Sequence, residues 1–295
     1  MPGYTIDGVP DHVLKNKLGA TTHDELQHFE TPLVAARDSE IRSGLGPRGN
    51  FDGEQLKAIH RHLFQDIYEW AGHTRNEVVG LSDGSFATEP FMHKGDARFM
   101  AGPAIPSALD EVTRSLRQSD CLRGLPRQEF AHRAADIMAK INGIHAFREG
   151  NGRTQRVFME ELARQAGHTL DFSVVSQERM IEASIAAYER GDPSAMRRLF
   201  DEISNPDRVE VLRTAEQSLD RNGFNWNERY IATVEPGHSV ELTLVGIAGN
   251  QFMAHTGSQI LLGRTSDLPK PYPQGGAEFT FVAPEHCWGQ ENERG

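Results

Sequence analysis

The stretch 145–156 (HAFREGNGRTQR) brings together a base, a carboxylate, a turn of small residues and two guanidinium groups. Helical apolar spacing precedes and follows it, so the small residues are expected to open a helix. A helix start presents free backbone N–H groups, and arginines beside them add positive charge, which is how proteins bind phosphates. A histidine at the edge of such a site can take a proton from an incoming nucleophile. The stretch therefore predicts chemistry on a nucleotide.

Each charged residue of this stretch has a predicted task. Glu149 can hold a divalent cation that bridges phosphate oxygens, because Mg²⁺ favours one or two carboxylates plus phosphates. Arg153 and Arg156 lie three residues apart, hence on one helix face, and can clamp two successive phosphates. Phe147 is predicted to be a buried anchor of the loop. Since Gly-Asn-Gly also marks ordinary turns, a helix–loop–helix corner with a surface histidine stays the alternative.

The elements that must position these residues are mainly helical over the first two thirds of the chain. Apolar spacing predicts helices over 51–72 (capped by Asp52), 106–118, from Arg127 to the loop (opened by Pro126), from the loop to Ala166 (ended by Gly167), and near 176–190, 193–203 and 206–221. Between 75 and 103, two turn signals separate short β-prone runs, which predicts one or two exposed hairpins.

After 222–223 the chain changes to short β-type runs, at 230–234, 239–245, 251–254, 259–262 and 278–282. Five short strands joined by glycine-containing turns predict a small barrel or sandwich, with an OB-like barrel as one candidate. The expected division is therefore a helical domain over 1–222 and a small β domain over 223–295.

The composition excludes several classes of protein. Of the 295 residues, 38% are hydrophobic and 25% charged, which is typical of a globular protein with a real core. The net charge of −11 argues against broad nucleic-acid or anionic-membrane binding, so no nucleic-acid partner is expected. No apolar run has the length of a signal peptide or a membrane span, so no membrane insertion is expected.

Cys121 and Cys287 lack metal spacing and predict free thiols. His28, His60 and His62 lie on expected helices without a carboxylate–histidine cluster, which favours core or solvated roles.

The stretch 145–156 resembles the signature of the Fic family, H-x-F-x-[DE]-G-N-G-R-x-x-R, at every specified position. The segments 51–64 (FDGEQLKAIHRHLF) and 68–72 (YEWAG) are similar to the helix before the family's flap, and 92–99 (MHKGDARF) is similar to the flap hairpin. The resemblance covers about residues 10–205 and is greatest to the Fic part of Bartonella effector proteins. It implies the Fic fold, a helical bundle with a β-hairpin flap, followed by a small OB-type domain. Those effectors end in a type IV secretion domain that this chain lacks, so a fragment of a longer protein is expected.

The resemblance implies a protein adenylyltransferase that moves AMP from ATP to a hydroxyl side chain of a target protein and releases pyrophosphate. His145 would be the general base, and its ordinary pKa near neutrality suits that role. The implied cofactor is Mg²⁺, ligated by Glu149. The implied ATP-binding residues are Gly150, Asn151 and Gly152 as an anion hole, Arg153 on the γ-phosphate, Arg156 on the β-phosphate, and Thr154 and Gln155 between them. Ala146 replaces a proline common in the family, and a modest effect on rate is expected.

The resemblance also implies partners. Lys94, Gly95 and Asp96 of the flap would dock the target by strand addition, while the segment 76–89 is either a recognition arm or a plain surface loop. The target would be a host protein such as a small GTPase, reached from the bacterial cytoplasm by type IV secretion into the host-cell cytoplasm.

Regulation and alternatives complete the expectations. No complete inhibitory [ST]-x-x-x-E-[GN] motif is found, which predicts a separate small antitoxin protein whose glutamate pairs with Arg153, or an unrestrained enzyme. Transfer of UMP or phosphate, removal of AMP, and a non-catalytic adaptor that binds a host protein stay open as alternatives.

Overall fold

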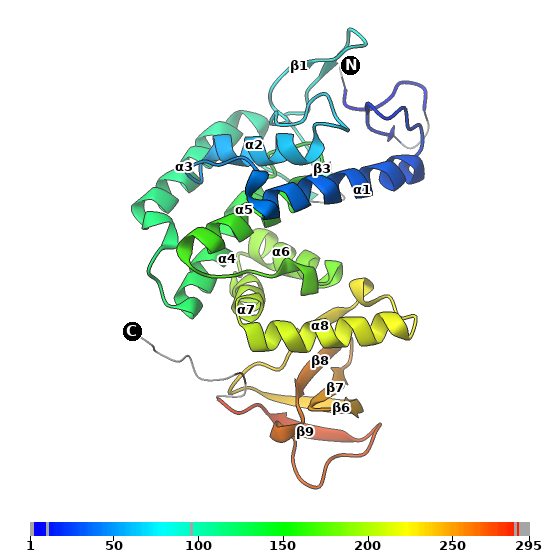
Figure 1. Ribbon diagram of the computed structural model, residues 1–295, viewed down its shortest axis with the longest axis vertical. Coiled ribbons are helices and arrows are strands. Elements are labelled where there is room, and N and C mark those ends of the chain that lie inside the picture. The colour runs from blue at the N-terminus through cyan, green and yellow to red at the C-terminus, as the bar shows by residue number, and fades with distance from the viewer. Residues whose placement is uncertain (1–2, 10–11, 95–96, 286–287, 289–295) are drawn as a thin grey trace. The chain divides into compact units, whose positions relative to one another are not determined.

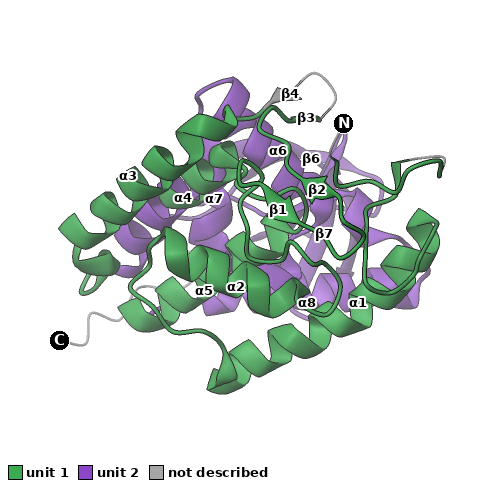
Figure 2. Cartoon of the chain, turned by 90° about the horizontal axis from the view of Figure 1, so that it is seen from above, with its two compact units in different colours: residues 1–125, 137–167 green, residues 126–136, 168–295 purple. Residues whose placement is uncertain are grey.

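The structure is a computed structural model that describes residues 3–9, 12–94, 97–285 and 288. The chain divides into two compact units (Figure 2). Unit 1 consists of residues 1–125 and 137–167, and unit 2 of residues 126–136 and 168–295.

The described chain has more residues in helices than in strands (Figure 1). The α-helices are α1 (His23–Glu40), α2 (Gly53–Phe64), α3 (Ile105–Gln118), α4 (Arg127–Ile144), α5 (Asn151–Ala166), α6 (Gln177–Glu189), α7 (Ser194–Ile203) and α8 (Pro206–Arg221). The strands are β1 (Val79–Gly80), β2 (Phe86–Ala87), β3 (His93–Lys94), β4 (Ala97–Arg98), β5 (Tyr230–Thr233), β6 (Ser239–Ala248), β7 (Gln251–Thr256), β8 (Gln259–Arg264) and β9 (Glu278–Val282).

In unit 1, helix α2 packs against α1, α3 and α5. The Asp52 side chain accepts from the Gln55 N–H at 2.9 Å, which confirms its predicted capping role. The prediction that this helix continues to about residue 72 is wrong, because it ends at Phe64. Ile67 and Tyr68 both donate their backbone N–H to the Phe64 carbonyl, so the chain turns there. Their side chains are still buried, which is why the apolar pattern continued past the end of the helix.

Helices α4 and α5 flank the loop 145–150, as the apolar spacing predicts. The buried side of α4 includes Phe130, Ala134, Ile137 and Ile141. Helix α5 ends at Ala166, and the left-handed φ of +85° at the next residue, Gly167, lets its N–H donate to the Ala163 and Arg164 carbonyls.

Both expected hairpins are present in unit 1. Strand β1 pairs antiparallel with β2, and β3 pairs antiparallel with β4, with His93 opposite Arg98. Strands β3 and β4 belong to the segment that resembles the Fic flap, and residues 89–100 are called the flap from here on.

In unit 2, the five predicted strands form one sheet in the order β5-β8-β7-β6-β9. The β5–β8 pair is parallel and the other pairs are antiparallel. Among the described residues β5 and β9 do not pair with each other, so the sheet is open and an OB-type barrel is not confirmed. A sheet closes into a barrel only when its two edge strands pair with each other, and the residue pattern of each single strand does not predict that pairing.

The sheet belongs to the same compact unit as α6, α7 and α8. Glu202 of α7 is buried and accepts from the backbone N–H of Thr233 in β5 at 2.5 Å. Arg208 of α8 donates to the Thr233 hydroxyl at 2.7 Å. The boundary expected at 222–223 stays a prediction. In the described part of the chain, no helix combines the length and the apolar character needed to cross a bilayer.

Candidate active site

The loop between α4 and α5 holds His145 in an unusual backbone conformation. Its φ is +48°, in the left-handed region that non-glycine residues rarely adopt. The His145 N–H donates to the Ile141 carbonyl at 3.2 Å, and its own carbonyl accepts from Arg75 Nε at 2.8 Å. The imidazole stacks on the Phe99 ring with centroids 3.8 Å apart. Because the backbone and the ring are both held, the histidine has a defined orientation.

The Asn151 side chain fixes the shape of the loop. Its Oδ1 accepts from the Phe147 N–H at 3.0 Å, and its Nδ2 donates to the Phe147 carbonyl at 2.7 Å. The oxygen and the nitrogen of the buried Asn151 side-chain amide are thus both bonded within the loop. The group of Asn151 that can contact a ligand is therefore its backbone N–H, which has no acceptor within the helix at this position. The Phe147 ring is buried and stacks on His60 at 3.9 Å, which confirms its predicted anchoring role.

His60 supports the same loop from helix α2. Its Nδ1 accepts from the Gly72 N–H at 2.8 Å, so the ring proton is on Nε2, which lies 3.0 Å from the Glu149 carbonyl and donates to it. Burial lowers the pKa of His60 to about 3, so the ring is neutral at physiological pH. Of the core and solvated roles that were predicted for this histidine, the structure shows the core role.

The start of helix α5 provides the predicted donors. Gly150 has a φ of +80° and its N–H donates to Glu149 Oε1 at 2.8 Å. The first backbone N–H groups of α5, from Asn151 and Gly152 onward, have no acceptor within the helix, as at any helix start. Such donors, together with the positive end of the helix dipole, favour a bound anion.

The two motif arginines differ in their surroundings. Arg153 forms ion pairs with Glu30 of α1 and, at 3.4 Å, with Glu149, and it lies 4.7 Å from the Phe64 ring centroid. In the described part of the chain, Arg156 has neither a hydrogen bond nor an ion pair. Burial and the nearby Arg153 charge lower the pKa of Arg156. Arg156 is therefore a cation whose hydrogen-bonding capacity is unused.

Two residues of the predicted ATP-binding set face the protein interior. The Thr154 and Gln155 side chains are buried, and Gln155 Nε2 lies 3.4 Å from the Ile141 carbonyl. Arg153 and Arg156 lie three positions apart and therefore share one face of the helix. Thr154 and Gln155, which come between them in the chain, lie on the other side of the helix, which faces the core. Their side chains thus support the loop from behind, and ATP contact by them stays a prediction.

The flap residues were predicted to dock a target. Lys94 lies in β3, and its backbone pairs with Ala97 of β4. Gly95 and Asp96 lie outside the described residues.

Sequence reasoning missed Glu30, which pairs with Arg153. Glu30 is buried on α1, where Leu26 and Val34 are buried four residues before and after it. Its Oε2 also accepts from the Tyr68 hydroxyl at 2.5 Å. The available signal was an acidic residue at helical spacing between two apolar residues, Leu26 and Val34.

A magnesium ion would have few protein ligands here. Among the described residues, no three His, Cys, Asp or Glu side chains gather closely enough to form a metal site by themselves. Glu149 is half-exposed at the helix start, and a single carboxylate beside phosphates is the arrangement that Mg²⁺ usually takes. The residues present therefore fit a Mg²⁺ that arrives with nucleotide.

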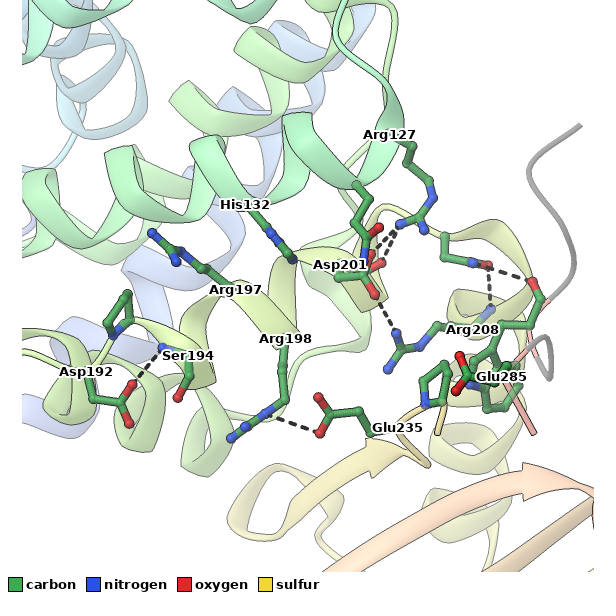
Figure 3. A pocket seen from close by; sticks show the side chains of 15 residues that line it. Arg127, His132, Asp192, Ser194, Arg197, Arg198, Asp201, Arg208, Glu235 and Glu285 are labelled. Atoms are coloured by element: carbon green, nitrogen blue, oxygen red, sulfur yellow. Dashed lines mark hydrogen bonds and ion pairs between the residues drawn. The ribbon is translucent and has the colours of Figure 1, made fainter. Parts of the chain in front are cut away.

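Unit 2 has a separate cavity of about 770 Å³ (Figure 3). Its arginines already have carboxylate partners: Arg127 and Arg208 pair with Asp201 at 2.8 and 2.9 Å, and Arg197 pairs with Asp136 at 2.8 Å. The cavity thus differs from the loop 145–150 and α5, where Arg156 keeps its donors.

The chain is similar to known proteins over the region that contains this loop. The model of the Fic/DOC family matches residues 50–163. A protein adenylyltransferase of Bartonella henselae is 35% identical over 244 residues, which are 80% of this chain and 44% of the relative. The chain therefore spans less than half the length of that relative.

The solved structure of the type IV secretion system effector protein BepA has a TM-score of 0.86 and 32% identity, and the match covers 95% of this chain and 96% of that chain. The BepC protein of Bartonella tribocorum, solved with bound AMPPNP, has a TM-score of 0.65 and 39% identity, with 68% of this chain and 95% of that chain covered.

Proposed function

The chain belongs to the Fic/DOC family, and we propose that it is a protein adenylyltransferase. In the proposed reaction a hydroxyl oxygen of a target side chain attacks the α-phosphorus of ATP. The bond from that phosphorus to the bridging oxygen of the β-phosphate breaks, and pyrophosphate leaves. The hydroxyl proton moves to His145.

One observation carries this proposal: a single short loop joins a fixed histidine to a helix start beside Arg156, which has no hydrogen bond or ion pair to any residue that the structure describes. His145 and the start of α5 at Asn151 are separated only by the residues 146–150. A base and an anion site so close together suit proton removal from a nucleophile that attacks a phosphate. The AMPPNP bound to the BepC structure supports a nucleoside triphosphate as the ligand.

The roles of the phosphate-binding residues follow from their surroundings. The N–H groups at the start of α5 would contact the α- and β-phosphates and stabilise negative charge in the transition state. Arg156 would bind the β-phosphate, and Arg153, which is partly exposed, the γ-phosphate. Glu149 would hold Mg²⁺, which when bound neutralises phosphate charge. Asn151 would act through its backbone N–H, since its side chain is bonded to Phe147.

We propose a host protein as the target and transfer by type IV secretion, on the basis of the similarity to BepA, which is named as a type IV secretion system effector. The flap would receive the target by strand addition. A small GTPase is the proposed class of target. The part of unit 2 that contains the five-stranded sheet would serve as a docking or spacer domain.

We propose that a small antitoxin protein restrains the enzyme through a glutamate that reaches Arg153. Arg153 is already shared between Glu30 and Glu149, so an incoming glutamate would compete with them for the guanidinium. A third carboxylate would also repel the γ-phosphate from that position.

The test is incubation with Mg²⁺ and ATP in eukaryotic cell lysate, with the label placed on the α-phosphate in one arm and the γ-phosphate in the other. AMP transfer labels a protein band from α-labelled ATP only, and the band is lost in His145→Ala. A band from γ-labelled ATP alone would show phosphate transfer. A band that appears only with α-labelled UTP would show UMP transfer. Binding of AMPPNP without any labelled band, with or without His145, would favour the adaptor.

A further inference from the structure

We infer that Arg75 is a positioning residue that couples the flap to the general base His145. The inference rests on the proposed function, in which His145 takes the proton. Arg75 is fully buried, with 0% of its surface exposed, and lies between the loop 145–150 and the two ends of the flap.

On the loop side, Arg75 binds successive backbone groups around the catalytic histidine. Its Nε donates to the His145 carbonyl at 2.8 Å, and its backbone N–H donates to the Ala146 carbonyl at 2.8 Å. One of its terminal nitrogens lies 3.5 Å from the Ile144 carbonyl. Three consecutive carbonyls, that of Ile144 at the end of α4 and those of His145 and Ala146 in the loop, therefore face the same residue.

On the flap side, the same guanidinium binds both ends of the flap. Its Nη1 donates to the carbonyls of Glu89 and Pro90 at 3.3 and 2.9 Å, and its Nη2 donates to the Met100 carbonyl. The backbone of Arg75 also accepts from the Glu89 N–H at 2.7 Å. The side chain of Arg75 thus hydrogen-bonds to both ends of the flap and to the loop 145–150.

The coupling matters because His145 is held in a strained conformation. A non-glycine residue at a left-handed φ is strained and persists only where its surroundings fix it. The bond to Arg75 holds the His145 carbonyl, and Phe99, next to Met100 at the end of the flap, stacks on the imidazole. When the flap end moves, the ring and the carbonyl of His145 would therefore both lose support.

The guanidinium shape is essential to this role. A planar fork can serve carbonyls on two sides at fixed angles, whereas a lysine ammonium has three donors on a flexible stem. Lysine would keep the positive charge but release part of this set of carbonyls. Arg75→Lys therefore separates the positioning role from the charge.

The first experiment measures label transfer from α-labelled ATP in lysate for the wild type, Arg75→Lys and Arg75→Ala. At saturating ATP the initial rate of Arg75→Lys should fall about 100-fold, the scale of a misplacement of about 1 Å, with unchanged affinity for AMPPNP. Guanidinium ion at a sub-denaturing concentration should restore part of the rate of Arg75→Ala. The control is Arg179→Lys in unit 2, a similarly buried arginine that lies 3.2 Å from the Ile231 carbonyl. It should keep the wild-type rate.

The second experiment does not depend on catalysis. Amide hydrogen exchange is measured in peptides that cover 97–104 of the flap end and 144–150 of the loop. Loss of a hydrogen bond to a charged group should speed exchange about tenfold or more in both segments of Arg75→Lys, and in neither segment of Arg179→Lys.

A second variant approaches the coupling from the flap. A Cβ on Gly102 would lie 2.7 Å from the Pro90 Cα, so Gly102→Ala should displace the Pro90 carbonyl that Arg75 binds. It should also speed exchange in both segments. This measurement remains decisive if Arg75→Ala and Arg75→Lys fail to fold.

Exchange that rises in the flap alone, or a full rate of Arg75→Lys despite faster exchange, would overturn the inference. Absence of label transfer by the wild type would instead overturn the proposed function. The exchange experiment would in that case still decide whether Arg75 couples the flap to the loop.

Discussion

Replacement of Gly150 by alanine tests how the loop 145–150 is built. Gly150 has a φ of +80°, and a Cβ there would lie 2.4 Å from two atoms of the Phe64 ring. The Phe64 ring is fully buried and packs near His60 at 4.9 Å, so it has little room to move. The substitution therefore combines backbone strain with overpacking at one residue.

The expected destabilisation follows from these two effects. A left-handed conformation costs an alanine about 1–2 kcal/mol, and overpacking of a core costs about 1–3 kcal/mol. The lower flexibility of the unfolded alanine chain offsets about 0.4–1 kcal/mol. The free energy of unfolding should fall by about 1–4.6 kcal/mol, which for a domain of 150–250 residues lowers Tm by roughly 2–18 °C.

The matched control is Gly152→Ala. A Cβ on Gly152 would find Arg156 Nη1 as its nearest neighbour, at an ordinary 3.7 Å, and Gly152 lies within α5. Alanine is the better helix former by up to about 1 kcal/mol, so this variant should melt at or above the wild-type Tm. Thermal unfolding followed by calorimetry measures both variants. Equal melting temperatures for the two variants would refute the reasoning from Gly150.

Three further predictions concern the groups around the loop. Tyr68→Phe removes the hydroxyl that donates to the Glu30 carboxylate. The free energy of unfolding measured in urea should therefore fall by about 1.5–3 kcal/mol. A change below about 0.5 kcal/mol would contradict a strong hydrogen bond between the two side chains. His60 has a lowered pKa of about 3, so unfolded chains take up a proton as the pH falls below about 6.5 while folded chains do not. The stability that neutral His60 provides is thus complete above that pH, and the free energy of unfolding should be about 2 kcal/mol lower at pH 5. In urea titrations, His60→Gln should lose correspondingly less stability between pH 7 and pH 5 than the wild type. Identical losses in the two proteins would be evidence against the lowered pKa of His60. Arg156→Ala should weaken AMPPNP binding about 10–100-fold by calorimetric titration, since a charge-assisted bond is lost, while Arg164→Ala on the exposed part of the same helix should bind normally.

Local features were predictable from the sequence because their causes are local. The Asp52 cap, the left-handed Gly167 and the apolar spacing placed helix ends near their observed positions. Turn residues between β-prone runs located both hairpins of unit 1 and the five strands of unit 2. There were two exceptions: no helix range was predicted for α1, and at the end of α2 buried residues continued the apolar pattern without a helix.

The residue types of the motif and the helices on either side of it could be recognised from the sequence alone, since the base, the carboxylate, the turn and the arginines follow one another in the chain. The tertiary structure decided which groups are free to act. Arg156 keeps its donors, whereas Arg153 is shared with Glu30 and the Asn151 amide is used within the loop. It also decided that Arg75 holds His145, which lies 70 residues away in the chain. Buried polar groups bond to whatever partner the packing brings within reach, and packing joins residues that no local pattern connects.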